Sequence, residues 1–598
     1  MFNSLLYCLS LLLLFICILY IKKSSEKLNI IKWCCLSLVC IFCINALVAY
    51  CLSYLSIPSN LLVVSFIYLL LSILIYFIFI KKGKQNYYFE KKDLLLLFIV
   101  LFVVIFIAIF RFGFPFSIRY ESLDAGVHYQ TAYSFYKKSL LLNFVSDGTI
   151  YNFQTWRFGS YVNLGLIFKV VSPLVSDINL YNVYILYDLF TLFFTGIIFY
   201  YLIQNFKSSK KKQFAYIIGT VLFLLGYPLN NLLFGFFYVG HASIIFMAII
   251  LLINDVQDEK ILFGSLFIMN IGILFTYYLF APIVFVPQFC YFIKHKNLFI
   301  KYIIIFVIPL ILWYIYFILP TFCNNDMNLI NQIGLDGYFY SDIFSNFILF
   351  FPIITYYFCN KKFNKKEMDY CSLLFIFLIF FIIIILCWNL LGIIKMYYVS
   401  KYFYILWIMC FLIFFKAIDK FYEKNKMIFR NYIVFIFFTI ILSISNIENN
   451  IINSSTIKEN KTTPVKIFGV YKYNIDLFVD GTCPFSNKEL HDIKKYYKLF
   501  GNDFLSNTEP DRVIWLINFI QPTKVDCPAN NLYNCINDMY YLDPNKFIEL
   551  HDDKLYYLFF SRSIYWKDPR KKFQFIEKID NGNYDIILTT FGYIIKEV

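Results

Sequence analysis

Long, nearly uncharged apolar runs recur through residues 1–446 of this chain, and they constrain its fold more than any other feature. Three of the longest are Leu61–Ile80, Leu94–Phe110 and Leu373–Leu386. A helix that crosses a bilayer needs about 20 mostly apolar residues, and these runs approach that length. The sequence therefore predicts an all-α polytopic bundle that spans a membrane.

Composition and charge support the same class of protein. Hydrophobic residues make up 60% of the chain and charged residues 15%, whereas a soluble chain carries about 25% charged residues. The net charge of +15 would suggest nucleic acid in a soluble protein. Here the basic residues sit in short tracts between apolar runs, as the positive-inside rule describes. We therefore expect membrane lipids as partners, and no nucleic acid.

Hydropathy predicts about 11–14 transmembrane helices. We interpret Met1–Ile21 as a retained first helix rather than a signal peptide, because no basic stretch precedes its apolar core and Lys22 and Lys23 follow it. The predicted helices lie near residues 3–21, 31–54, 60–80, 94–113, 181–205, 214–234, 241–254, 261–279, 281–294, 299–319, 343–359, 371–392, 401–416 and 428–446.

The basic tracts alternate regularly with these helices, so that all of them fall on one side, which by charge is cytoplasmic. The loops 114–180 and 320–342 and the tail 447–598 fall on the other side. We therefore expect a protein of the bacterial cytoplasmic membrane whose C-terminus lies outside. The basic tracts are Lys22–Lys23, Lys81–Lys92, Lys207–Lys212, Lys294–Lys296, Lys361–Lys366 and Lys416–Lys426.

The tail 447–598 differs in composition from the rest of the chain, and we expect a small extracytoplasmic α+β domain there. It alternates β-rich runs with turn signals, and Asp580–Asn583 is a hairpin signal between two such runs. Cys527 and Cys535 can form a disulfide if the tail faces an oxidising compartment. The β-rich runs are Pro464–Phe478, Arg512–Ile520, Lys554–Ser561 and Tyr584–Ile595.

The outer loop 114–180 holds the first candidate site. The stretch Asp124–Lys138 resembles a helix, on which Asp124 and His128, four residues apart, share a face. Its apolar and aromatic residues could lay this helix in the membrane interface. The pair could act as a general base with an orienting partner or supply two ligands to a divalent metal. Alternatively, Asp124 is a helix N-cap and His128 bonds a neighbouring loop.

A second candidate lies between two predicted helices at the outer face. Lys395 and Lys401 flank a segment that contains Tyr398, and cations at this face run against the positive-inside trend. A basic pair with tyrosines at headgroup depth suits a lipid phosphate or pyrophosphate. The alternative is that both lysines only reach out to lipid headgroups.

Three further outer-face residues are weaker candidates. His241 places an imidazole at a helix start, where it can line a site or simply pack. Trp156 could stack on a sugar, and Arg157 could bind its phosphate, although structural packing explains the tryptophan as well.

A long first outer loop, an acidic residue just past the membrane exit, a following juxtamembrane helix and a C-terminal outer domain together resemble the GT-C superfamily of membrane glycosyltransferases. The resemblance implies a polyprenyl-phosphate-linked sugar as donor and a glycan, lipid or protein as acceptor. It also implies that Asp124 is the catalytic base or a metal-linked residue. The nearest second acid is Glu121, so the chain has no adjacent acidic pair at this position, and it also lacks the Trp-Trp-Asp motif of oligosaccharyltransferases.

The sequence leaves alternatives of other classes open. A transporter, or a lipid or polysaccharide flippase, would place polar residues near the middle of the bilayer. Most predicted helices here have no charge at that depth, with Asp188 as an exception, and polar residues gather at one face, which favours the enzyme. A polysaccharide polymerase or ligase of another fold would share the lipid-linked substrate.

Overall fold

The structure is a computed structural model of the chain. It describes residues 1–21, 28–80, 87–141, 158–205, 213–256, 258–293, 296–314, 346–360, 369–391, 396–421, 425–444, 469–480, 484–496, 504–507, 515, 556–560, 584–590 and 592–597.

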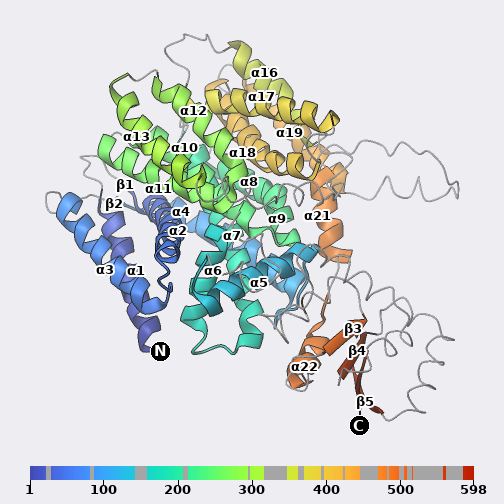
Figure 1. Cartoon of the computed structure of the whole chain (residues 1–598). Helices are drawn as coiled ribbons and strands as arrows, with labels where there is room; N and C mark the ends of the chain where they lie inside the picture. Colours follow the sequence, from blue (N-terminus) through green and yellow to red (C-terminus); the bar gives the residue numbers. More distant parts are fainter. Residues whose placement is uncertain are drawn as a thin grey trace, which may run out of the picture.

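Apolar helices dominate the described residues and pack into one bundle (Figure 1). Ten helical segments among these residues are long and apolar enough to cross a membrane, which confirms the prediction of an integral multi-pass membrane protein. The helices of the bundle are α1 (Phe2–Leu19), α2 (Ile30–Tyr54), α3 (Leu61–Ile75), α4 (Lys91–Ile107), α7 (Leu180–Gln204), α8 (Gln213–Leu225), α9 (Tyr227–Phe234), α10 (Phe237–Asp255), α11 (Glu259–Tyr277), α12 (Ala281–Ile293), α13 (Lys296–Trp313), α16 (Phe351–Asn360), α17 (Tyr370–Leu390), α18 (Met396–Phe421) and α19 (Lys426–Ile444).

Burial separates central helices from peripheral ones. Helices α10 and α18 are enclosed almost completely by other helices, whereas most residues of α1, α3 and α4 are only partly buried or are exposed. Phe66 on α3 and Phe98 on α4, for example, are 63% and 68% exposed. Large exposed apolar faces of this kind suit a lipid solvent, so the candidate site must be sought around the central helices.

One predicted span is divided in two. The run 214–234 forms α8 and α9, and the chain breaks at Gly226, with Pro228 in the first turn of α9. Proline is tolerated at a helix start because its missing N–H would be unpaired there anyway. Asn474 bonds both sides of the break: its side-chain amide donates to the carbonyl of Leu225, the last residue of α8, and to the carbonyl of Gly226, the N-cap of α9, at 2.8 and 2.7 Å.

The outer loop 114–180 contains two helices. Helix α5 (Leu123–Lys138) confirms the predicted helix, and α6 (Phe158–Val171) is a shorter apolar helix that the sequence analysis did not predict. The two helices pack closely because Gly165 has no side chain: a Cβ there would lie 2.7 Å from the Phe135 ring. Tyr133 and Phe135 are consequently 3% and 1% exposed, so this face of α5 packs against protein rather than lying in a lipid interface.

The first described segment of the tail is a helix rather than a β-rich run. Helix α21 (Gly469–Asp480) occupies most of the run 464–478 that we predicted as β-rich. That prediction was wrong because the run buries one helical face: Val470, Tyr471 and Asn474 are 0%, 3% and 1% exposed. These residues lie against the bundle, where α21 contacts α9 and α19. Contact with the bundle, rather than local β-propensity, determines the structure here.

The rest of the described tail comprises helix α22 (Asn487–Tyr496) and a four-stranded sheet in the order β3-β4-β6-β5. Strand β3 is parallel to β4, and the other two pairs are antiparallel. The predicted β-rich run 584–595 holds the antiparallel strands β5 and β6. Cys527, Cys535 and the hairpin signal 580–583 lie outside the described residues. The strands are β3 (Phe504–Asn507), β4 (Tyr556–Phe560), β5 (Tyr584–Thr589) and β6 (Gly592–Glu597).

Candidate functional site

The site begins at the first turn of α5. Ser122 is the N-cap, and its hydroxyl accepts a hydrogen bond from the Asp124 backbone N–H at 3.0 Å. Asp124 is therefore not the cap, as one interpretation of the sequence held, but lies in the first helical turn and is partly exposed. A carboxylate at this position is favoured by the positive end of the helix dipole.

His128 follows one turn later on the same face of α5 and is 4% exposed. Its Nδ1 atom lies 2.8 Å from the Tyr161 hydroxyl. Its polar partner therefore belongs to helix α6 and not to a loop, as the alternative interpretation held. Three rings at the start of α10 surround His128: the ring centroids of Phe236, the N-cap, and of Phe237 and Tyr238 lie 6.3, 6.1 and 4.9 Å from the imidazole. The imidazole is therefore held on two sides, by α6 and by this aromatic segment.

Lys401 approaches the same aromatic segment from α18. Its ammonium nitrogen lies 3.3 Å from the centroid of the Phe236 ring and 5.9 Å from that of Tyr238. The side chain is 0% exposed, so it does not reach out to lipid headgroups. Phe236 and Tyr238 thus bring together Lys401 and His128, two candidates that are far apart in the sequence.

Gly235 makes this approach possible. It ends α9 in the left-handed conformation, with φ of 71°, where glycine is strongly favoured. A Cβ at this position would lie only 2.5 Å from the Ala125 Cβ, so the glycine lets the α9–α10 connection lie against the first turn of α5. The Tyr184 hydroxyl donates to the Gly235 carbonyl at 3.3 Å and thereby ties the same connection to α7.

Glu121, the nearest second acid, forms an ion pair with Arg111. Arg111 is 1% exposed and also donates to the carbonyls of Arg119 and of Leu477 in α21, at 2.9 and 2.6 Å. Breaking a buried pair of this kind is costly, because it leaves an uncompensated charge. The geometry therefore gives Glu121 a structural part: it neutralises Arg111, which joins the outer loop to the tail.

His241 contacts the same Phe237 ring as His128, with a centroid distance of 5.9 Å. Its Nε2 atom is 3.1 Å from the Thr191 hydroxyl, and its ring stacks on Phe42 with a centroid distance of 5.4 Å. The imidazole is 3% exposed. It belongs to a deeper polar layer between α7 and α10, separate from the group around Asp124.

The other predicted candidates are not placed. Lys395, Trp156 and Arg157 lie outside the described residues, and Tyr398 belongs to the first turn of α18 but its side chain is not described. Within the described part of the chain, no group of three or more His, Cys, Asp and Glu side chains could hold a metal ion. A divalent metal stays a prediction, with Asp124 and His128 as its two candidate ligands.

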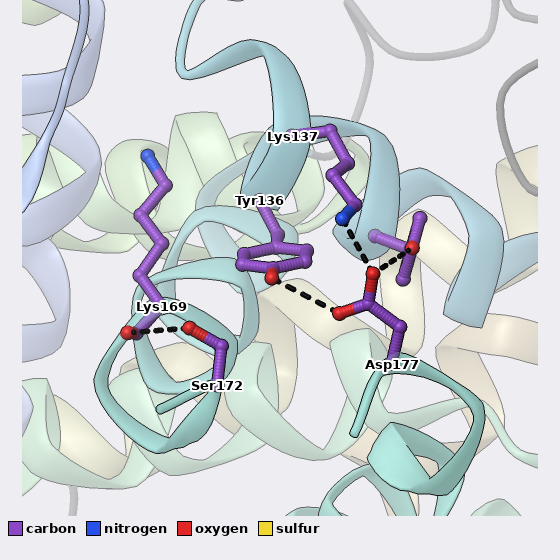
Figure 2. Close-up of polar contacts among 6 residues, drawn as sticks. Tyr136, Lys137, Lys169, Ser172 and Asp177 are labelled. Atoms are coloured by element: carbon purple, nitrogen blue, oxygen red, sulfur yellow. Dashed lines mark hydrogen bonds and ion pairs between the residues drawn. The ribbon is translucent and has the colours of Figure 1, made fainter. Parts of the chain in front are cut away.

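The C-terminal half of α5 is anchored by Asp177, which precedes α7. Figure 2 shows Tyr136 and Lys137 pointing toward this carboxylate. Asp177 accepts hydrogen bonds from Tyr133, Tyr136 and Lys137 at 3.0, 3.1 and 2.5 Å. Burial, and then the neighbouring carboxylate, raise the pKa of Tyr133, so its hydroxyl stays a donor.

A buried lysine binds the C-terminal end of α5. Lys169 in α6 donates to the Ser59 carbonyl and to the hydroxyl of Ser139, each at 2.7 Å, and Ser139 is the C-cap of α5. Its ammonium lies 4.8 Å from the centroid of the Phe135 ring. Figure 2 also shows Ser172 beside it, donating to the Lys169 carbonyl at 3.1 Å. Burial lowers the pKa of Lys169 to about 7.

Sequence analysis missed one residue that touches the site from the tail. Trp515 is 1% exposed and packs against Tyr120, Tyr129 and Tyr184, with ring centroids 6.3, 5.4 and 6.2 Å away. Tyr129 is the neighbour of His128 on α5. Nothing in a single sequence links a tail tryptophan to a loop hundreds of residues earlier, so no local signal could have revealed this contact.

Comparison with known proteins finds no family model, no curated protein and no solved structure that matches this chain.

Proposed function

We propose that this protein is a membrane glycosyltransferase that moves a sugar from a polyprenyl-phosphate-linked donor to an acceptor on the extracytoplasmic face. The observation that supports this function best is the meeting of α5 and α18 at the aromatic segment Phe236–Tyr238. The imidazole of His128, one turn after Asp124 on α5, contacts the Tyr238 ring, and the buried ammonium of Lys401 lies against the Phe236 ring. We also propose that residues 447–598 form an α+β domain on the extracytoplasmic face.

The roles follow from the chemistry of transfer. Asp124 takes the proton of the acceptor hydroxyl, as a general base. The acceptor oxygen then attacks the anomeric carbon of the sugar, the bond from that carbon to the phosphate oxygen breaks, and the polyprenyl phosphate leaves with the bonding electrons. Lys401, together with Lys395 or Arg157, stabilises the negative charge on the departing phosphate. His128, fixed by Tyr161, orients the groups around the carboxylate.

Burial of Lys401 strengthens its proposed part. A charge acts more strongly on another charge in a poorly solvated site than in water, because the effective dielectric constant is lower there. The Phe236 ring covers the ammonium, so the phosphate would approach at the edge of this ring, on the side of Tyr238 and His128. A sugar next to the phosphate would then come toward the first turn of α5.

The test is donor turnover by purified protein in nanodiscs. A panel of radiolabelled polyprenyl-phosphate hexoses is supplied with membrane glycan as acceptor, and released polyprenyl phosphate is measured. We expect release from at least one donor, and a decrease in kcat of about 10²–10⁴-fold in Asp124→Asn. The matched control is Asp476→Asn, which removes a half-exposed carboxylate paired with the largely buried Lys472. It lies outside the proposed site, so the folded variant should keep its turnover.

Size-exclusion profiles show whether each variant folds. If no donor releases its phosphate, or if folded Asp124→Asn turns over like the unaltered protein, the proposal fails.

A transporter or flippase is the second candidate, because Asp188 is buried within the span of α7 and intramembrane carboxylates are typical of transport proteins. Movement of a labelled polyprenyl phosphate across proteoliposomes, without cleavage of the sugar–phosphate bond, would support this function instead.

A further inference from the structure

Asp188 is an ionisable residue deep inside the bundle. It lies in the third turn of α7, about 12 Å from the helix start at 1.5 Å per residue, and it is 3% exposed. A bare carboxylate in such a place is costly, so it is normally neutralised by a proton, a cation or a paired side chain. None of the ion pairs formed by the described residues includes Asp188.

A small cavity lies next to this carboxylate. The helices around it, α7, α9, α10 and α18, contact one another in the middle of the bundle (Figure 1). The cavity volume is about 20 Å³, which is enough for one particle the size of a water molecule. Oxygen-bearing side chains from all four helices contribute to its wall: Asp188, Thr191, Thr195, Asn231, Ser243 and Tyr404.

Two of these oxygens are buried acceptors with incomplete hydrogen bonding, although the Tyr120 hydroxyl can donate toward the Asp188 carboxylate. Across the described part of the chain, one carboxylate oxygen of Asp188 and the side-chain carbonyl of Asn231 have no hydrogen-bond partner. Buried polar atoms are nearly always satisfied, because leaving one unpaired costs roughly 1–3 kcal/mol. Both residues line the same cavity, so one ligand bound there could interact with both oxygens.

The two threonines in the wall add further acceptor capacity. Thr191 and Thr195 donate their hydroxyl protons along α7, to the carbonyls of Tyr187 and Thr191, at 2.9 and 2.8 Å. A hydroxyl that has given its proton elsewhere has only lone pairs left. One lone pair of Thr191 faces the Nε2 atom of His241 at 3.1 Å, which leaves the other for the cavity. The cavity wall is therefore rich in hydrogen-bond acceptors, and such a wall favours a positively charged ligand.

We propose that this cavity binds one monovalent cation, coordinated by Asp188, Asn231 and the hydroxyls of Thr191 and Thr195. Oxygen ligands suit hard cations, and a single positive charge balances the single carboxylate. Phe237 lines the cavity and also contacts His128, so the cation lies one aromatic ring below the proposed transfer site. Its binding holds four central helices together and does not depend on the proposed transferase activity.

The test is thermal unfolding of the purified protein at constant ionic strength. Chloride salts of lithium, sodium, potassium and the bulky cation N-methyl-D-glucamine are compared. A ligand that binds only the folded state raises the Tm, so we expect at least one inorganic cation to raise it, saturably, by on the order of a few degrees. Asp188→Asn should abolish this rise in Tm. Thr195→Val should increase the cation concentration at which half of the rise is reached.

Asp93→Asn is the matched control. Asp93 is also a buried carboxylate, but its oxygens accept hydrogen bonds from Asn29, Tyr201 and the Glu90 backbone N–H, so this variant should keep the cation-dependent shift. Equal Tm values in all four salts would overturn the proposal and leave a proton on Asp188. An undiminished shift in Asp188→Asn would overturn it too, and if that variant does not fold, Asn231→Leu decides by the same criterion.

Discussion

Single residues show how this protein keeps charges inside a membrane bundle. Arg111 is neutralised by Glu121, Lys169 donates to two oxygens, Lys401 lies against an aromatic face, and Asp188 faces a small polar cavity. Each solution lowers the cost of desolvating a charge in a different way. The last two residues both lie near the Phe236–Tyr238 segment.

The part played by Lys401 can be separated into binding and catalysis. Arginine keeps the positive charge and also packs on aromatic faces, so Lys401→Arg should retain part of the transfer activity, whereas Lys401→Gln should lose most of it. A contact made equally in ground and transition states raises KM when it is removed, whereas one that stabilises the leaving phosphate lowers kcat. Steady-state kinetics on both variants therefore distinguish the two.

Lys420 provides the control, because it lies on the same helix near the opposite end. Lys420→Gln should behave like the unaltered protein. Should Lys401→Gln match it in both kcat and KM, Lys401 has no part in donor binding, and the transporter hypothesis rises above the transferase. Lys395→Gln, tested beside it, shows whether the other lysine of the predicted pair contributes.

Lys169 predicts a dependence of stability on pH. Its pKa is about 7 in the folded protein because of burial, against about 10.4 in an unfolded chain. Between these values the unfolded state binds more protons, so the free energy of unfolding should rise with pH from about 7 to 10, by on the order of a few kcal/mol. Below pH 7 the cost of the buried charge is fully present.

The measurement is the Tm of the unaltered protein minus that of Lys169→Met, across pH 6 to 9.5. This difference should increase with pH above 7, because methionine removes the titrating group and keeps most of the packing. A flat difference would show that Lys169 is not desolvated as the structure indicates.

Among the elements, α5 is the one on which the candidate site depends. Its first turn lies against Gly235 at the end of α9, and its last turns are anchored by Asp177 and by Lys169 (Figure 2). Fixing both ends lets the helix hold Asp124 and His128 toward the bundle. The predicted amphipathic interface helix is instead an internal element, because α6 and the α9–α10 connection cover its aromatic face.

Gly235→Ala tests this dependence. Alanine at φ of 71° is strained by roughly 1 kcal/mol, and its Cβ would meet that of Ala125 at 2.5 Å, so the connection must move away from α5. We expect a lower Tm and a loss of transfer activity larger than the loss of stability explains. Gly264→Ala is the control: a Cβ at this α11 glycine meets nothing within 4 Å, so that variant should be as stable or more stable.

At the scale of the whole molecule, contacts agree with the alternation of loops inferred from charge. Strands β1 (Leu28–Asn29) and β2 (Tyr87–Tyr88) pair beside two tracts assigned to one side. At the other side, Asn487 in the tail donates to the Pro115 carbonyl of the outer loop at 2.9 Å. The N-terminus, α5, α6 and the tail sheet lie toward the same end of the bundle in Figure 1.

These contacts pair the loops but do not orient the protein in its membrane, so the outward C-terminus stays a prediction. Alkaline phosphatase and a fluorescent protein that matures only in the cytoplasm are fused separately to Val598. We expect only the phosphatase fusion to be active, because the basic tracts hold the other face inside. Fluorescence without phosphatase activity would invert the topology and place the candidate site in the cytoplasm.

The sequence alone determined the membrane class, most of the helices and the shared face of Asp124 and His128. These properties depend on local hydropathy and helical periodicity, which residues a few positions apart already encode. It also placed Lys401 at the outer end of α18, although not its burial against Phe236.

Only the tertiary structure decided which polar groups meet. The ion pair of Glu121 with Arg111, the burial of Trp515 beside α5 and the cavity next to Asp188 all join segments far apart in the sequence. The same holds for α21, whose residues prefer strands locally but form a helix because the bundle covers one face. Contacts of this kind depend on how helices pack, and no local pattern in the chain specifies them.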